Sequence, residues 1–210
     1  MPELVAVSVG TPREVRAGKR LVPTAIWKEP VGGRIAVRGV NIAGDDQADR
    51  TVHGGPDKAI YAYALEDTAW WEEELGRDLG PGAFGENLST RGIDVSGALI
   101  AERWAIGSTL LEVRQPRFPC FKLGLRMADP LFLKRFAAAN RTGAYFGILE
   151  EGDIGAGDQI EVVELPEETL TIADFAHIVL RDHSRAGELL ALPALPPEWH
   201  AWARERAQAA

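Results

Sequence analysis

Residues 103–113 read RWAIGSTLLEV, and this stretch is the most informative about the fold. It contains two short apolar runs on either side of Gly107-Ser108. Runs of this kind that are separated by two residues including a glycine are typical of a β-hairpin. We therefore expect one strand over 103–106, a second strand over 109–113 and a tight turn between them.

Several more strands are expected before and after this hairpin in the sequence, because short apolar runs there end at glycine or proline. These runs lie at 4–9, 22–27, 35–40, 60–64, 87–88, 143–150 and 159–163. We expect the last two to form a closing pair. Helical spacing of apolar residues is found instead at 67–79 and 129–139. Many short strands with few helices predict a mainly β fold with peripheral helices, a closed or partly closed β-barrel rather than a βαβ sheet.

The character of the chain changes near Leu165-Pro166. Thr171 and Asp174 form a capping-box pattern at the start of an apolar run. Three helices are predicted from here on, at 172–180, 184–192 and 197–207. We therefore divide the chain into a β-barrel domain over 1–164 and a small three-helix unit over 165–210. A unit of this size is near the lower limit for independent folding, so we expect it to pack on the barrel or on a partner chain.

Composition excludes several classes of protein. The chain has 210 residues and a net charge of −8, which argues against a general nucleic-acid binder. No apolar stretch approaches the roughly 20 residues of a membrane span, and the N-terminus shows no secretory signal. The single cysteine allows no internal disulfide. We therefore expect a cytoplasmic protein without membrane or nucleic-acid partners.

That cysteine, Cys120, lies in an unusual setting. Residues 113–128 contain four basic side chains and no acidic one. Positive charge close to a cysteine favours the reactive thiolate, and Pro116 and Pro119 stiffen the approach to it. The segment therefore predicts a nucleophile or a soft-metal ligand, with Arg117 and Lys122 beside it. The alternative is a small buried hydrophobe, since free cysteine is often buried.

Three other segments carry candidate chemistry. His53-Gly54-Gly55-Pro56-Asp57-Lys58 allows an anion-binding turn of backbone N–H groups with a lysine beside it, or is a plain connecting turn. The carboxylates of 44–50 do not match a calcium loop, so a solvated polar loop is expected there. Asn87 offers a donor and an acceptor that suit the edge of a heterocycle, or it only leads a loop into a strand. The sequence contains no zinc, phosphate-loop or Gly-x-Ser-x-Gly pattern.

Five segments in order carry a resemblance to a known family. They are GDDQAD at 44–49, HGGPDKAIY at 53–61, FGENL at 84–88, Ile106-Gly107, and QPRFPCFKL at 115–123. In this order they resemble the MOSC domain, named for the C-terminal domain of molybdenum cofactor sulfurases, over about 4–164. The tail resembles the 3-alpha domain that follows MOSC in a bacterial subgroup, the YiiM type, linked to 6-hydroxylaminopurine resistance.

The resemblance implies a β-barrel and a molybdopterin-type molybdenum cofactor. Cys120 would be the molybdenum ligand and the catalytic residue. The residues implied in cofactor binding are His53, Gly54, Gly55, Lys58, Asn87, Arg117 and Lys122. Larger members carry a pyridoxal-phosphate domain upstream, but this chain shows no Schiff-base site, so we expect no pyridoxal phosphate in it.

Three functions remain open from the sequence. The resemblance implies an oxidoreductase that reduces small N-hydroxylated bases or amines. Because the chain has no flavin, haem or nicotinamide motif, an external electron-donor protein would be needed. The second function is a non-redox carrier, in which Cys120 holds a persulfide or the cofactor. The third is an interaction module with a structural Cys120. The helical tail would serve a homodimer or donor docking.

Overall fold

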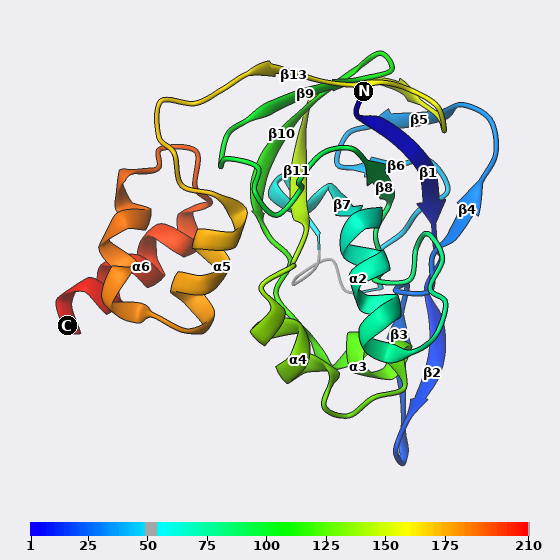
Figure 1. The fold of residues 1–210 in the computed structure, drawn as a ribbon, viewed down its shortest axis with the longest axis horizontal. Coiled ribbons are helices and arrows are strands. Elements are labelled where there is room, and N and C mark those ends of the chain that lie inside the picture. Colours follow the sequence, from blue (N-terminus) through cyan, green and yellow to red (C-terminus); the bar gives the residue numbers. More distant parts are fainter. Residues whose placement is uncertain (49–53, 210) are drawn as a thin grey trace.

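The computed structural model describes residues 1–48 and 54–209, and its largest element is an eight-stranded sheet (Figure 1). In sheet order, its strands are β13 (Ile160–Glu164), β9 (Arg103–Ile106), β10 (Thr109–Pro116), β11 (Ala144–Glu150), β7 (Ile60–Ala64), β8 (Leu88–Arg91), β1 (Glu3–Val9) and β4 (Glu29–Val31). The expected hairpin is confirmed, because Ile106 pairs with Thr109 across the Gly107-Ser108 turn. Gly107 has a φ of 57°, which glycine adopts without strain.

Two smaller sheets complete the β structure. β12 (Gly152–Ile154), β5 (Ile35–Arg38) and β6 (Asn41–Ile42) form one of them. β2 (Arg13–Ala17) and β3 (Arg20–Thr24) form a separate two-stranded ribbon that projects from the body, at the bottom of Figure 1. The strand expected at 22–27 is therefore the second strand of this ribbon, and it begins and ends earlier.

The ends of the large sheet come close without forming a closed ring. Glu3 forms an isolated bridge with Gln159, and Leu4 exchanges backbone hydrogen bonds with Gly157 and Asp158. β13 and β4 nevertheless remain the outer strands of the sheet. A sheet-dominated fold with peripheral helices is confirmed, whereas a closed barrel is not.

The expected pairing of 143–150 with 159–163 is wrong. β11 lies between β10 and β7, and β13 pairs with β9. The error arises because strands that follow one another along the chain need not be neighbours in a sheet.

Three helices lie around the end of the sheet at which β10 reaches Pro116 (Figure 1). α2 (Leu65–Leu75) connects β7 to β8 and packs on both, and these two strands are parallel. Parallel neighbours need such a crossover. α4 (Phe132–Ala139) starts later than expected, because Asp129 Oδ1 accepts a hydrogen bond from the N–H of Leu131 (2.8 Å) and caps a turn before the helix. α3 (Phe121–Met127) was not expected.

Two hydrophobic clusters support the elements. The larger one joins the sheet, with Trp104 and Phe146, to the C-terminal segment, with Phe175 and Ile178. The smaller one is largely aromatic and lies under α2, α3 and α4; its fully buried rings include Trp71, Phe84, Phe132 and Phe136. Within the described residues, no helix is both long and apolar enough to cross a membrane.

The C-terminal segment contains α5 (Ile172–Leu180), the 3₁₀ segment η2 (His183–Ala191) and α6 (Pro197–Ala209). The capping box at its start is confirmed, since Thr171 and Asp174 exchange side-chain-to-backbone hydrogen bonds. The middle element is 3₁₀ rather than α-helical, so three α-helices are not confirmed. The segment forms a lobe beside β10 and packs on the sheet, as Figure 1 shows. The boundary at 164 stays a prediction.

Candidate functional site

A cavity opens beside α3, between the ribbon of β2 and β3 and the ends of the central strands. It contains about 660 Å³ of free space when the part that is open to solvent is included. Its walls come from segments far apart in the sequence: 24–28, 45–48, 58–61, 84–87, 117–122 and Tyr145. The sequence-predicted residues Lys58, Asn87, Arg117, Cys120 and Lys122 all line it.

Cys120 is partly exposed in this cavity, at the start of α3. Its Sγ lies 3.7 Å from Nη2 of Arg117, whose side chain is buried and stacks on the ring of Phe136 (5.6 Å). Burial lowers the pKa of Arg117, whereas Cys120 and the neighbouring tyrosines raise it. Together these groups outweigh burial, so the pKa of Arg117 is above its ordinary value. The thiol therefore faces a permanent positive charge and an open space rather than an aliphatic core.

Two tyrosines form the wall next to Arg117. The rings of Tyr61 and Tyr145 lie 5.2 Å apart, and the hydroxyl of Tyr61 donates to the backbone oxygen of Thr142 (2.9 Å). Burial raises the pKa of both phenols, although Arg117 opposes this. Both remain protonated at neutral pH and add no negative charge to the cavity.

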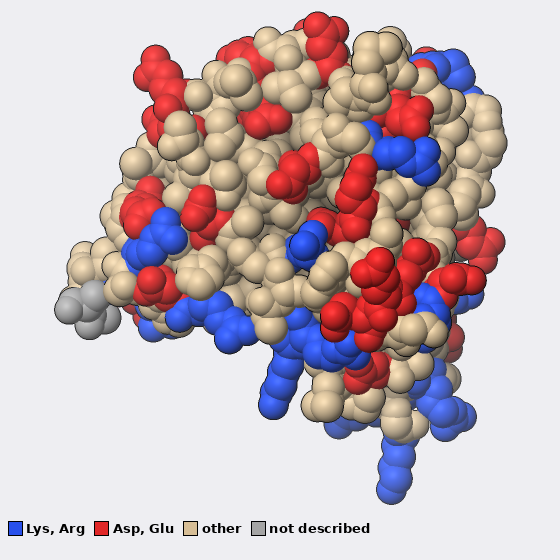
Figure 2. All heavy atoms as spheres, in the orientation of Figure 1, with Lys and Arg blue, Asp and Glu red and all other residues tan. Residues whose placement is uncertain are grey.

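The charge lining the cavity differs from that of the whole protein. Among the described lining residues, four are cationic, namely Lys28, Lys58, Arg117 and Lys122, and two are acidic, Asp45 and Asp46. Figure 2 shows the same contrast on the surface: basic side chains gather along the lower edge, near the β2–β3 ribbon, while acidic ones are spread over the rest of this face. A locally positive cavity in an acidic protein suits an anionic ligand.

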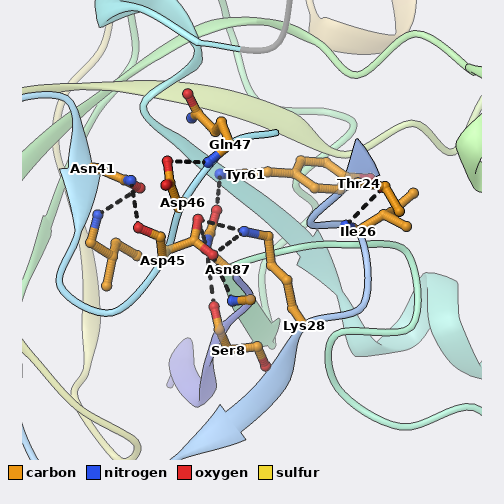
Figure 3. Close-up of polar contacts among 12 residues, drawn as sticks. Ser8, Thr24, Ile26, Lys28, Asn41, Asp45, Asp46, Gln47, Tyr61 and Asn87 are labelled. Carbon is orange, nitrogen blue, oxygen red and sulfur yellow. Dashed lines mark hydrogen bonds and ion pairs between the residues drawn. The ribbon is translucent and has the colours of Figure 1, made fainter. Parts of the chain in front are cut away.

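Lys28 and Asp45 form a buried ion pair on the cavity wall (Figure 3). The Asp45 carboxylate also accepts hydrogen bonds from the N–H of Gly10 (2.8 Å) and from Nδ2 of Asn87 (3.0 Å). Burial lowers the pKa of Lys28, although Asp45 and two other carboxylates oppose this shift. The side chain of Asp45 is only 1% exposed, so the expectation of a solvated loop is wrong at this position.

Asn87 lines the cavity, but its amide serves the protein itself. Oδ1 accepts from the N–H of Tyr61 (3.1 Å), and Nδ2 donates to the backbone oxygen of Ser8 (3.2 Å) as well as to Asp45. This arrangement holds β1, β7 and the 45–48 loop together (Figure 3). Asn87 therefore orients the wall and does not present a free amide edge to a ligand.

The glycine turn lies where the chain enters η1 (Pro56–Lys58). Gly55 has a φ of 100°, and its backbone oxygen accepts from the N–H of Lys58 (3.1 Å). Gly54 and Gly55 are not among the described cavity-lining residues, although Lys58 is. His53 lies outside the described residues.

Sequence analysis did not single out Lys28, Asp45 or the buried Glu86 as site residues. Glu86 accepts hydrogen bonds from the N–H of Gly82 (2.6 Å) and Phe84 (3.0 Å), and burial raises its pKa despite them. It organises the loop that carries Phe84 and Gly85 into the cavity. No local signal identifies Lys28 as buried, because its partner Asp45 is contributed by another loop.

Gly85 allows this loop to approach the opposite wall. Its φ is 81°, and an added Cβ would lie 2.7 Å from Cγ1 of Ile26. Gly85→Ala is expected to lower the free energy of unfolding by roughly 2–5 kcal/mol, through left-handed strain and overpacking together. Gly76→Ala is the control, because Gly76 also has a positive φ but open space around it, and strain alone costs about 1–2 kcal/mol. Equal losses in urea denaturation would contradict the close approach.

The chain is similar to known proteins in sequence and in fold. The MOSC domain family matches residues 49–161. The chain is 30% identical to the uncharacterized protein YflK of Bacillus subtilis, over 94% of this chain and 91% of that protein. The crystal structure of YiiM from Geobacillus stearothermophilus superposes with a TM-score of 0.81 at 31% identity, over 98% of this chain and 99% of that one. A protein named reductase from Gibberella moniliformis is 30% identical over 75% of this chain but only 29% of its own length.

The chain therefore belongs to the MOSC domain family. Ten of the eighteen described lining residues, including Cys120, lie within the matched residues, and the walls at 24–28 and 45–48 lie before them.

Proposed function

We propose that the protein binds a molybdenum cofactor of the molybdopterin type in this cavity and reduces N-hydroxylated bases or amines. The observation that carries the proposal is the position of the chain's only cysteine. Its sulfur lies in an open, cation-lined cavity, 3.7 Å from a buried guanidinium. A soft thiolate suits molybdenum, and a cofactor phosphate needs cationic and N–H donors.

The donor set fits a cofactor that brings its own metal ligands. Among residues 1–48 and 54–209, no group of three or more His, Cys, Asp or Glu side chains could hold a metal ion. Cys120 would supply one ligand, while Lys58, Arg117 and Lys122 would hold the phosphate and the pterin. Gly54 and Gly55 are not among the described lining residues, and their turn would act on the ligand only by setting the position of Lys58. The bound cofactor would supply the redox chemistry of the reaction.

The remaining walls prepare the site for this ligand. Arg117 keeps a positive charge beside Sγ of Cys120. Tyr61 and Tyr145 stay neutral. The apolar rings of Phe84 and Phe118 also line the cavity and would limit the access of water to the ligand on their side of it. The electron donor would be a separate protein in a reducing cytoplasm, where a partly exposed thiol stays reduced.

A second candidate is a carrier that holds sulfur or the cofactor and transfers it. The partial exposure of Cys120 favours it, because a transfer partner must reach the sulfur. The two functions share the cavity and differ in whether turnover occurs there.

One experiment separates them. The full chain is produced in a host that makes the cofactor, and bound molybdenum is measured together with reduction of 6-hydroxylaminopurine by reduced benzyl viologen. Molybdenum with turnover supports the reductase; molybdenum or a Cys120 persulfide without turnover supports the carrier.

Lys58→Ala should lower cofactor retention roughly tenfold through loss of one phosphate contact. Lys134→Ala on the exposed side of α4 is the control and should retain it. A wild-type protein with neither molybdenum nor persulfide would refute both functions.

A further inference from the structure

The amide of Gln115 connects the C-terminal lobe to the cavity wall. Gln115 lies on β10 and is completely buried. Its Oε1 accepts a hydrogen bond from Nε1 of Trp199 on α6 (2.9 Å), and its Nε2 donates to the backbone oxygen of Asp57 in η1 (3.1 Å). Because a buried amide that loses a partner is strongly penalised, these two bonds fix its orientation.

Both ends of this connection continue directly into the cavity. Asp57 precedes Lys58, and Gln115 precedes the turn that carries Arg117 and Cys120. Nε of Arg114 adds a longer contact to Oδ1 of Asp57 (3.7 Å). The segment with Lys58 and the segment with Cys120 are therefore held in a fixed relative position by contacts outside the cavity.

The ring of Trp199 supports the same turn by packing. It lies 4.9 Å from the ring of Phe118 and 5.2 Å from that of Phe175 on α5. Phe118 lines the cavity, and its backbone oxygen accepts a hydrogen bond from Nη1 of Arg117 (3.1 Å). Trp199 is not among the described cavity-lining residues, so it acts on the cavity through Gln115 and Phe118.

We propose that Trp199 is a positioning residue through which the C-terminal lobe sets the relative placement of Lys58, Arg117 and Cys120. The inference builds on the proposed function, because the placement matters for a ligand that contacts the thiol and the cations together. The lobe then helps to position the site residues, although Trp199 itself is not among the described residues that line the cavity.

Trp199→Phe tests this inference, because it keeps an aromatic ring beside Phe118 but removes the Nε1–H donor to Gln115. Trp202→Phe is the matched control: it is the same substitution on the same helix, it keeps an aromatic ring beside His183 (5.4 Å) and Trp199 (6.1 Å), and it leaves the Nε1–H of Trp199 in place. The full chain is prepared without cofactor, and the rate at which iodoacetamide alkylates Cys120 is followed by mass spectrometry. Thermal unfolding is measured on each variant.

We expect Trp199→Phe to change the alkylation rate by about threefold or more, because thiol reactivity follows local charge and access. Trp202→Phe should leave that rate unchanged, even where it lowers the melting temperature to a similar degree. Gln115→Met should change the rate as well. The double variant should change it no further than Gln115→Met alone, because Gln115→Met already removes the acceptor of the hydrogen bond that Trp199→Phe deletes.

Equal alkylation rates in wild type and Trp199→Phe, or equal effects of the two tryptophan variants, would overturn the inference. The outcome is separable from that of the proposed function, because alkylation needs no cofactor. A wild-type protein that never binds molybdenum would refute the function, while the alkylation rates would still decide whether Trp199 positions the thiol.

Discussion

Cys120→Ser is expected to abolish molybdenum retention in protein from a cofactor-producing host. Serine stays protonated at neutral pH and is a poor ligand for a soft metal. The loss should exceed the roughly 10–100-fold that changes around metal ligands typically cost. The fold should survive, because the side chain is partly exposed and serine is close in size. Metal analysis of the purified variant, with thermal unfolding beside it, measures both effects.

Phe121→Ala is the control for this variant. Phe121 follows Cys120 in the chain, is 52% exposed, and is not among the described cavity-lining residues. It should retain molybdenum at the wild-type level. Unchanged molybdenum in Cys120→Ser would count against both the reductase and the carrier, since each depends on that sulfur.

Asp45→Ala should cause the largest loss of stability. It leaves Lys28, a residue that is only 8% exposed, without the ion-pair partner of its ammonium group. It also removes the acceptor for Gly10 and Asn87. Breaking one side of a buried pair typically costs about 3–5 kcal/mol, which urea denaturation would measure as a lower midpoint. Glu3→Ala breaks the exposed pair with Arg91 and should cost at most about 1 kcal/mol.

The loss should depend on pH in a defined direction. Burial lowers the pKa of Lys28 below its ordinary value of 10.5, and removal of Asp45 lowers it further. Between the folded and unfolded values the unfolded chain binds more protons, so the stability of the variant rises with pH in that window. The pKa of Lys28 is already lowered in the wild type, so the deficit of Asp45→Ala should shrink only while the pH rises from the folded pKa of Lys28 in the variant to that in the wild type. From there to 10.5 both proteins gain stability equally and the deficit should stay constant. A deficit that stays constant over the whole pH range would show that the lost hydrogen bonds, not the buried charge, dominate.

Local signals account for the parts of the fold that sequence analysis predicted. Strands at 60–64 and 103–106 and the helix at 172–180 match the structure residue for residue. Each has its signal within a few residues, as in the capping box of Thr171 and Asp174. Strand neighbours were not predictable in the same way, because β13 lies beside β9 through contacts between distant residues. α3 was missed because it is short and contains Gly124, a poor helix former.

The residues of the candidate site also fall into those that a local sequence signal predicted and those that it did not. A basic segment around Cys120 is visible in the sequence, and the residues predicted from it line the cavity. The Lys28–Asp45 pair was missed because the two residues lie 17 positions apart on different loops, and each alone is typical of a solvated surface. The amide of Asn87 was assigned to a ligand because nothing in the sequence shows that three protein groups already occupy it.

The cavity walls come from segments between Thr24 and Tyr145, so no single piece of chain contains the site. A molecule that binds there can contact all of these segments only while the domain is folded. Occupancy and folding are then thermodynamically linked: a ligand at about 100 times its Kd adds about 2.7 kcal/mol to the free energy of unfolding. Cellular supply of such a molecule would set not only how much of the protein is loaded but also how much of it escapes proteolysis.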